Sequence, residues 1–292
     1  MVRSKDEKII EKFAYIIMIL VGIIVVVPFI ILFVSSITDE ATLLSEGYSL
    51  IPRKFSLAAY SYIWDSKDTI FRAYLTTIGI TFIGTLVSVI ITAMIAYPLS
   101  LSYLPGKKIV SFIVLFTMLF NGGLVPTYMN YTTIIGIKNT YLALLLPNLM
   151  FSAVNCIIVR TYFQGNIPAE LYESARIDGA SEFKIFTTMV LPLGKPILVT
   201  IGIFAGLGYW NDWMNGLYYI TDQKMYSIQQ LLNVMIQNIQ YLTQYGQSGG
   251  QNIPSIGLRM AIAFVAMLPL IILYPFLQKY FEAGITLGAV KG

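Results

Sequence analysis

The feature that most constrains this chain is a recurring long run of residues without any charge. The first run extends from Phe13 to Ile37, and five more follow at 73–106, 109–137, 139–159, 196–211 and 260–278. The fifth run continues as apolar sequence to Ile220, interrupted only by Asp212. A helix that spans a membrane needs about 20 predominantly apolar residues. Six such runs exceed what one soluble core needs, so the sequence predicts an all-α membrane protein with six transmembrane helices.

We expect a single transmembrane domain over residues 1–292, with spans at about 13–37, 74–98, 109–131, 140–163, 196–220 and 258–280. A mean hydropathy of +0.72 agrees with a chain whose solvent is lipid. The first apolar run is longer than the core of a signal peptide, about 7–15 residues. We therefore expect it to remain as a span rather than to be cleaved.

The distribution of Lys and Arg predicts the orientation. Six spans put both termini on one side, and that side carries twelve of the 19 Lys and Arg residues. The other side carries seven, in a longer total loop. By the positive-inside rule the first side is cytoplasmic, and so is the loop 166–195 between the fourth and fifth spans. The sequence pI near 8.9 reflects this bias and does not indicate nucleic-acid binding.

Several kinds of active site are excluded by the residue types that the chain lacks. It contains no histidine, which removes His-based triads, His metal sites and the commonest general base. Its one cysteine, Cys156, allows neither an intrachain disulfide nor a CxxC metal site. It also has no GxxxxGK[ST] phosphate-binding loop. We expect a chain that is not an enzyme and that binds no cofactor or metal of its own.

Polar residues also occur in three apolar or amphipathic segments, where they have either a packing role or a binding role. Asn121-Gly122-Gly123 precedes Pro126 in the third run, and this break either packs closely against another helix or lines a solute path. Residues 228–239 form an amphipathic pattern that either docks an extracellular partner or lies at the membrane interface. Asn148 and Asn155, seven residues apart, are expected to share one face of the fourth span and to hydrogen-bond between helices.

One polar segment interrupts the apolar chain, with six charged residues between positions 170 and 184. Glu170 favours the positive end of a helix, Gly179 can take the left-handed conformation that ends it, and Ser181 can cap a second helix. Pro192 and Pro196 are expected to stop this second helix before the fifth span. We expect a helix–turn–helix on the cytoplasmic surface, suited to a groove on a partner.

This segment resembles the EAA loop of ABC importer permeases, whose pattern is E-A-A, three residues, G, nine residues, I, one residue, L-P. Two positions depart from it: Ser174 stands for Ala, and Met189 stands for Ile with similar volume. The resemblance implies that the loop couples the chain to ATPase subunits. The residues implied in coupling are Glu173, Ser174, Ala175, Asp178, Gly179, Ala180, Leu191 and Pro192.

The resemblance covers the whole chain. The six spans, the position of the loop and the ending GITLGAVKG (284–292) are similar to the smaller permease of maltose-type carbohydrate importers, which have the type I importer fold. NGGLVPTY (121–128) and YWNDW (209–213) resemble the branch that handles larger oligosaccharides in Gram-positive bacteria. The resemblance implies a multi-pass protein of the bacterial cell membrane. Its cytoplasmic tail, with Gly288 and Lys291, would reach between the ATPase subunits.

The resemblance also implies a division of labour among several proteins. This chain would form half of a pathway, and a homologous second permease would form the other half. Two ATPase subunits would bind ATP and Mg, and an extracellular, lipid-anchored binding protein would deliver an oligosaccharide. Two alternatives stay open: the same fold importing a peptide or polyamine, and an ATP-independent secondary transporter. An intramembrane enzyme is disfavoured, because the chain lacks His and a paired acid site.

Candidate solute contacts lie late in the fifth span, about 20–28 Å along from Pro196 and towards the outer half. Flat aromatic faces with amide and carboxylate groups suit a polyhydroxylated solute, and an acid within a membrane span is functional by default. Trp and Tyr also populate membrane interfaces without binding a solute, so both interpretations stay open. The candidates there are Tyr209, Trp210, Asn211, Asp212 and Trp213, and Asn121 in the third run is a further one.

Overall fold

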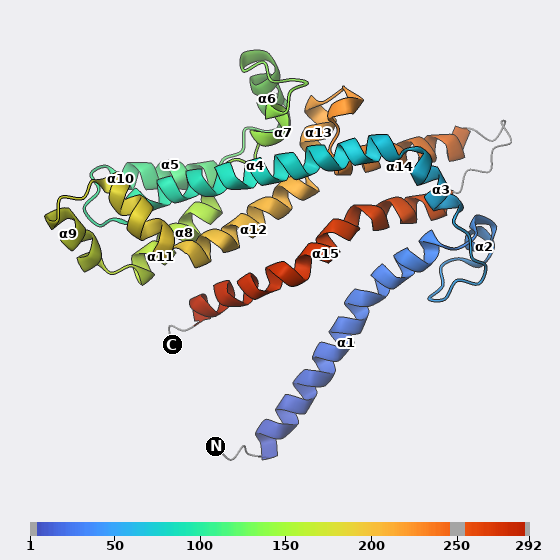
Figure 1. Ribbon diagram of the computed structural model, residues 1–292, viewed down its shortest axis with the longest axis horizontal. Helices are drawn as coiled ribbons and strands as arrows, with labels where there is room; N and C mark the ends of the chain where they lie inside the picture. Colours follow the sequence, from blue (N-terminus) through green and yellow to red (C-terminus); the bar gives the residue numbers. More distant parts are fainter. Residues whose placement is uncertain (1–4, 246–254, 290–292) are drawn as a thin grey trace. The chain divides into compact units, whose positions relative to one another are not determined.

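The computed structural model describes residues 5–245 and 255–289, which fold almost entirely into helices (Figure 1). The α-helices are α1 (Lys5–Ser36), α2 (Glu40–Glu46), α3 (Ala58–Asp65), α4 (Lys67–Ser100), α5 (Lys107–Leu119), α6 (Leu124–Met129), α7 (Leu142–Leu145), α8 (Ala153–Asn166), α9 (Ala169–Ile177), α10 (Glu182–Ile185), α11 (Leu191–Leu193), α12 (Lys195–Asn211), α13 (Met214–Tyr219), α14 (Ile228–Tyr245) and α15 (Ser255–Ala289). Short π- and 3₁₀-helical turns are η1 (Asn130–Ile134), η2 (Phe186–Val190) and η3 (Gln223–Met225).

Three helical segments among the described residues are long and apolar enough to cross a membrane: Ile10–Ser36, Lys67–Ser100 and Ile256–Pro275. Two bent pairs raise the number to five if each counts as one span. Lys107–Leu119 and Leu124–Ile134 meet at 112°, and Glu182–Leu193 and Lys195–Asn211 meet at 79°. The predicted all-α membrane fold is confirmed. The number of spans, their bounds and the side of the termini stay predictions.

The region predicted as the fourth span contains a break. Asn148 has a φ of 63°, and α8 begins only after Ser152, whose side chain accepts from the Asn155 amide at 3.4 Å. Pro147 cannot continue a helix, because its ring removes a donor and clashes with the preceding turn. The expectation that Asn148 and Asn155 share a helix face is therefore wrong.

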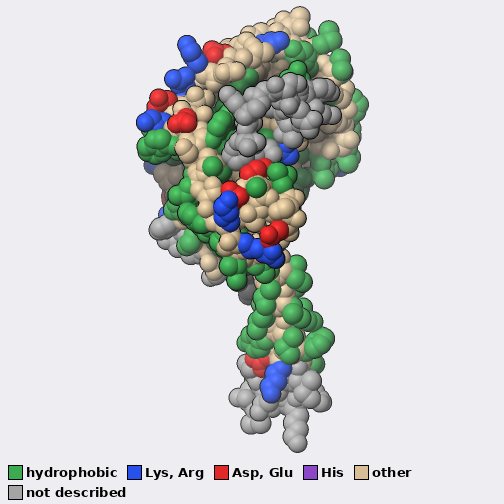
Figure 2. All heavy atoms as spheres, turned by 90° about the vertical axis from the view of Figure 1, so that its right-hand side faces the viewer, with side chains coloured by type: hydrophobic (Ala, Val, Ile, Leu, Met, Phe, Trp, Pro, Cys, Tyr) green, Lys and Arg blue, Asp and Glu red, His purple; other side chains and the backbone are tan. Residues whose placement is uncertain are grey.

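The chain forms two compact units: residues up to Asp68 with Leu232–Leu270, and Thr69–Leu231 with the residues from Ile271. In the first unit, the apolar window of α1 has no buried residue. Its hydrophobic side chains form the green column in Figure 2 that ends in the grey N-terminal residues. A helix that is apolar all round and exposed in the single chain is suited to contact with lipid.

A long-range helix cap closes the first unit. The Glu40 carboxylate accepts hydrogen bonds from the backbone amides of Ile256 and Gly257, both at 2.9 Å. A carboxylate at a helix N-terminus satisfies free amides and complements the helix dipole. The rings of Phe33 and Phe264 lie 4.9 Å apart and join α1 to α15 nearby.

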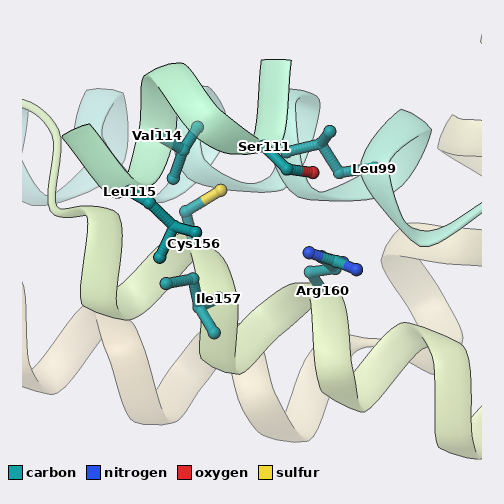
Figure 3. Close-up of a pocket in the computed structure, with 7 residues that line it drawn as sticks. All are labelled: Leu99, Ser111, Val114, Leu115, Cys156, Ile157 and Arg160. Carbon is teal, nitrogen blue, oxygen red and sulfur yellow. The ribbon is translucent and has the colours of Figure 1, made fainter. Parts of the chain in front are cut away.

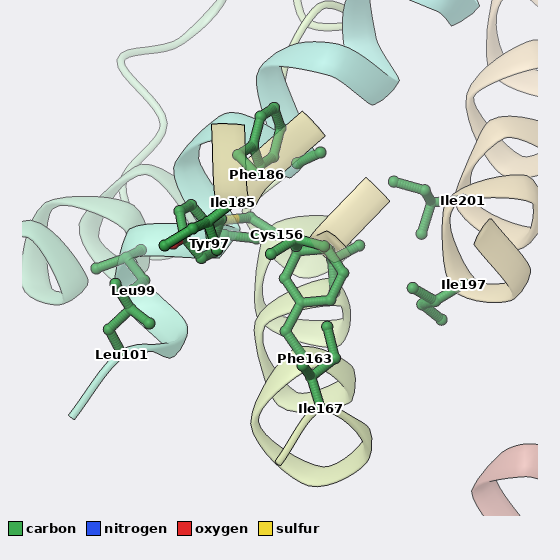
Figure 4. Close-up of a cluster of buried hydrophobic side chains, with 14 of the residues drawn as sticks. Tyr97, Leu99, Leu101, Cys156, Phe163, Ile167, Ile185, Phe186, Ile197 and Ile201 are labelled. Carbon is green, nitrogen blue, oxygen red and sulfur yellow. The ribbon is translucent and has the colours of Figure 1, made fainter. Parts of the chain in front are cut away.

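The second unit is built around a buried apolar cluster contributed by α4, α8, the loop helices and α12 (Figure 4). A glycine is needed at position 194, at the bend before α12, because the Phe163 ring packs against its backbone. A Cβ there would lie 2.5 Å from that ring. The labelled members of the cluster are Tyr97, Leu99, Leu101, Cys156, Phe163, Ile167, Ile185, Phe186, Ile197 and Ile201.

The second helix of the loop stops between Pro192 and Pro196, before α12, as expected. The π-helical turn η2 precedes α11, and the helical path continues through Pro192 to Leu193 before it bends by 79°. A π-turn is wider than an α-turn, and one immediately upstream relieves the clash that a proline ring makes with the preceding carbonyl. The bend falls at Gly194, and Pro196 lies in the first turn of α12.

Small residues bring α12 against α4. A Cβ on Gly202 or Gly206 would approach Thr85 to 3.9 Å or 3.3 Å, so these two glycines, four apart, face the same threonine. Glycines at this spacing let the backbones of membrane helices approach closely. Further along, the Tyr209 ring lies over Gly84, where a Cβ would be 2.4 Å from the ring.

Candidate functional site

The polar segment folds as the predicted helix–turn–helix. After α9, Gly179 has a φ of 77°, the left-handed conformation expected of it. Its amide donates to the Arg176 carbonyl at 3.0 Å, and the Ala180 amide donates to the Ala175 carbonyl at 2.9 Å. These two bonds form a Schellman end, which satisfies the last carbonyls of the helix. The predicted glycine corner is confirmed.

The second helix of the loop begins with the predicted cap. The Ser181 hydroxyl accepts from the Lys184 amide at 3.3 Å, and Glu182 occupies the first turn of α10. The residues expected to couple to ATPase subunits therefore lie at three places. Glu173, Ser174 and Ala175 are on α9, 178–180 form the corner, and Leu191-Pro192 are on α11.

The two helices of the loop expose apolar residues on a polar background. Tyr172 of α9 has only 6% of its surface exposed. Its side chain packs into the buried apolar cluster and so attaches the loop to the second unit. Ile177 and Phe183, on either side of the corner, are 86% and 72% exposed. We call Glu173, Ile177, Gly179 and Phe183 the loop face. Nothing lies within 4 Å of a Cβ built on Gly179, so glycine is needed for its backbone conformation and not for packing.

Four side chains tie this corner to the end of α4, and we call them the clasp: Tyr97, Tyr103, Arg176 and Glu182. The Tyr97 hydroxyl donates to Glu182 Oε2 at 2.6 Å, and Arg176 Nε donates to Glu182 Oε1 at 2.7 Å. The Arg176 guanidinium also donates to the Tyr103 hydroxyl and lies 4.5 Å from the centre of that ring. Charge-assisted bonds of this kind fix geometry as well as adding stability. The clasp holds α9 and α10 against the segment that follows α4.

The clasp changes the acidity of its carboxyl group. Burial pushes the pKa of Glu182 upward, but hydrogen bonds from Tyr97 and Arg176 and the Arg176 charge outweigh burial, so its pKa lies below the ordinary value. Glu182 is therefore ionised at neutral pH and accepts from both donors.

The clasp was not among the predicted site residues. Arg176 and Glu182 flank the glycine corner, and this opposite-charge pair across a turn is a local signal for an ion pair. Tyr97 and Tyr103 come from 85 and 79 residues away from Glu182 along the chain. No local pattern indicates such partners, because only the packing of α4 against the loop brings them together.

The five candidate solute contacts from Tyr209 to Trp213 lie where α12 ends and α13 begins. Several of them have structural roles. Tyr209 is 3% exposed, and its hydroxyl donates to the Leu145 carbonyl at 2.9 Å. The Asn211 amide donates to the Leu207 carbonyl of its own helix at 3.0 Å. Asp212 Oδ1 accepts from the Asn215 amide at 3.2 Å and so caps α13. Asp212 therefore lies at a helix break rather than within a continuous span.

The remaining candidate solute contacts, Trp210, Trp213 and Asn121, differ in exposure. Trp210 is 5% exposed, and its buried indole Nε1 has no hydrogen-bond partner among the described residues. Trp213 is 39% exposed. Asn121 is exposed, and its Oδ1 accepts from the Gly123 amide at 2.8 Å in a local turn. The Tyr128 and Tyr219 rings, stacked at 5.7 Å, join α6 to α13.

Gly288 is part of α15, whereas Lys291 lies outside the described residues. Within the described ranges, no group of three His, Cys, Asp or Glu side chains is arranged to hold a metal ion.

Comparison with known proteins links this architecture to one family. Residues 81–287 match the family model described as the binding-protein-dependent transport system inner membrane component. The chain is 38% identical to Protein LplC of Bacillus subtilis (strain 168), covering 93% of this chain and 91% of that protein. It is 37% identical to the polygalacturonan/rhamnogalacturonan transport system permease protein YtcP of the same organism, covering 98% and 99%.

A solved structure agrees with these relatives. The chain superposes with a TM-score of 0.80 on a chain of a bacterial ABC transporter involved in the import of the acidic polysaccharide alginate. The two are 26% identical, and the match covers 96% of this chain and 99% of the other. The predicted importer-permease fold is confirmed by this match.

Proposed function

Because the chain belongs to the family of binding-protein-dependent transport system inner membrane components, we propose that it forms half of the transmembrane pathway of an ATP-driven oligosaccharide importer. Family membership makes it a multi-pass protein of the bacterial cell membrane. The names of YtcP and of the alginate importer support a saccharide as solute. The observation that carries the coupling role is the loop face, which is exposed, partly apolar and held in place by the clasp.

The proposed importer divides its tasks among several chains. A homologous permease supplies the other half of the pathway, and an extracellular, lipid-anchored binding protein delivers the sugar. Two ATPase subunits hold ATP and Mg, and the chain itself catalyses no reaction. The loop face docks on these subunits through Glu173, Ile177 and Phe183, and the tail 284–292 reaches between them. Closure of the ATPase pair moves the loop, and the spans follow as a rigid body between two states.

The solute contact is proposed at the break between α12 and α13. Trp213 and Asn211 are exposed there and offer a flat aromatic face and an amide to a sugar. Trp210 is buried beside them and supports the break. The exposed side chain of Asn121 offers an amide like that of Asn211. Tyr209 and Asp212 act by positioning the break, through the Leu145 carbonyl and the first turn of α13.

Reconstitution tests the proposal. The chain is placed in liposomes with its second permease, its ATPase subunits and the binding protein, and uptake of labelled oligosaccharide is measured together with ATP hydrolysis. Hydrolysis is expected only with the ATPase subunits, and it rises when sugar-loaded binding protein is added.

Two results would overturn the proposal. One is ATP hydrolysis by the purified single chain. The other is uptake that continues when the phosphate-binding lysine of the ATPase subunits is replaced. Trp213→Ala should reduce sugar uptake and leave assembly intact. Leu217→Ala is the control, since Leu217 is an exposed residue of neighbouring α13 that has no proposed role.

A further inference from the structure

A small cavity in the second unit is lined by the end of α4, the first turns of α5 and the middle of α8 (Figure 3). It measures about 90 Å³ and its lining is apolar except for Ser111 and Arg160. A single water needs about 10–15 Å³ of such space, so the cavity has room for a group with several oxygen atoms. Figure 3 shows the Arg160 guanidinium turned towards α5 at one end of this space.

Arg160 has no acceptor in the described part of the protein. Its Nε is buried and makes no hydrogen bond, and no described carboxylate forms an ion pair with it. A guanidinium carries five donors in a fixed plane and stays charged under all conditions in proteins. The residue as a whole is partly buried, and a partly buried guanidinium gains stability when an anion accepts from its donors. The cavity therefore presents a cationic donor at one end.

The level of the cavity along the helices favours a ligand from the membrane surface. Arg160 lies six residues before the end of α8, about 9 Å, and Ser111 lies four residues after the start of α5, about 6 Å. Both helix ends lie next to loops, and α8 leads directly into α9. With the loop 166–195 at the cytoplasmic membrane surface, as the sequence predicts, both residues lie near the level of the lipid headgroups.

Further positive charge lies at the start of α5, where Lys107 and Lys108 stand. Burial and, after it, the charge of Arg160 lower the pKa of the Lys107 ammonium, which donates to the Leu101 carbonyl at 2.7 Å. The N-terminus of α5 adds its own partial positive charge. An anion would relieve this repulsion.

We propose that this cavity binds the phosphate of an anionic phospholipid, with Arg160 and Ser111 as donors and Lys108 near the headgroup. The choice of a lipid over a free anion rests on the apolar lining and on the exposed Phe112, Ile113 and Ile158 on the same two helices. Acyl chains use such a surface and inorganic phosphate does not. Basic pockets between membrane helices commonly take lipid headgroups. The inference goes beyond the proposed function and is independent of the solute.

Native mass spectrometry of the intact importer in detergent tests the proposal. The complex is titrated with phosphatidylglycerol and, separately, with phosphatidylcholine of the same acyl chains. Phosphatidylglycerol is expected to occupy one site per copy of this chain, and Arg160→Gln should weaken that binding by about fivefold. Arg72→Gln is the matched control, because Arg72 is exposed near the opposite end of α4 and should leave binding unchanged.

Cys156 supplies a second measurement within the cavity, since it is the only cysteine of the chain. Phosphatidylglycerol should slow its reaction with methyl methanethiosulfonate in the wild type and not in Arg160→Gln.

Three results would overturn the proposal. The first is equal binding of phosphatidylcholine, and the second is equal protection of Cys156 by inorganic phosphate. The third is lipid binding by the isolated chain that disappears in the assembled importer, which would identify a partner permease as the occupant.

Discussion

At the scale of single residues, the contact between Gly84 and Tyr209 shows how little space separates two spans. The ring occupies the position of a side chain that α4 does not have, and its hydroxyl reaches Leu145 on α7. One glycine therefore allows a single tyrosine to join three helices. Tyr209 was predicted as a solute contact. Sequence alone does not distinguish an aromatic residue that binds a solute from one that packs between helices near a membrane interface.

We predict that Gly84→Ala destabilises the chain by about 1–3 kcal/mol, the usual cost of overpacking. The new Cβ would lie 2.4 Å from the Tyr209 ring, and the ring cannot move without losing its bond to Leu145. Gly79→Ala on the same helix is the control, because nothing lies within 4 Å of a Cβ there. Thermal unfolding followed by size-exclusion chromatography in detergent measures both. Equal melting temperatures for the two variants would contradict the packing described.

The lowered pKa of Glu182 predicts a pH dependence. Because the folded pKa lies below the unfolded one, the clasp contributes stability above the unfolded value of about 4.3 and loses it as pH falls through the folded value. Glu182→Gln should lower stability at pH 7 by less than about 1 kcal/mol, since its side chain is 54% exposed. The difference from wild type should shrink below about pH 4.

Thermal unfolding at a series of pH values tests this expectation. Glu173→Gln is the control, because Glu173 is an exposed residue of the same loop outside the clasp, and it should leave thermal stability at pH 7 unchanged. A difference between wild type and Glu182→Gln that stays constant down to pH 3 would mean that Glu182 has no role in the clasp.

At the scale of elements, the loop helices were predicted from sequence because their signals are local. Gly179 ends α9 and Ser181 begins α10, and each acts within three or four residues. Pro192 and Pro196 also act locally, and the helix ends between them at Leu193. The clasp escaped prediction, because Tyr97 and Tyr103 are brought to Glu182 only by tertiary packing.

We predict that Gly179→Val and Ala175→Trp leave membrane insertion intact and break the coupling of transport to ATP hydrolysis. Valine at a φ of 77° costs roughly 1–2 kcal/mol of backbone strain, which distorts the corner. Ala175 is half-buried and packs against the buried cluster, so tryptophan there shifts α9 and the loop face. Co-purification with the ATPase subunits and hydrolysis stimulated by the binding protein are the measurements.

Gly47→Val separates strain from docking. Gly47 has a φ of 76° and, like Gly179, nothing within 4 Å of its added Cβ, so the strain is matched at a site outside the loop. This variant should keep stimulated hydrolysis. If Gly179→Val also keeps it, the loop face does not dock.

At the scale of the whole molecule, the family and the helical architecture were predictable, because apolar run lengths and the spacing of the EAA pattern act over long stretches. The side of the membrane on which each loop lies stays a prediction from the Lys and Arg distribution. In a Cys156→Ala background, a cysteine at Ser248 should react with an impermeant thiol reagent from outside, and one at Ser181 only after the membrane is opened. Reaction of both from outside would reverse the orientation.

The cap that Glu40 places on α15 also orders events during synthesis. The bonded residues are 216 and 217 positions apart, so the carboxylate leaves the ribosome long before the helix end that it caps. At about 5–20 residues per second, the delay is on the order of 10–40 s. Throughout that interval the segment after α1 is already made while its closing partner does not exist. The first unit can therefore close only after α15 has begun to form, and a chain truncated before residue 255 cannot form this cap.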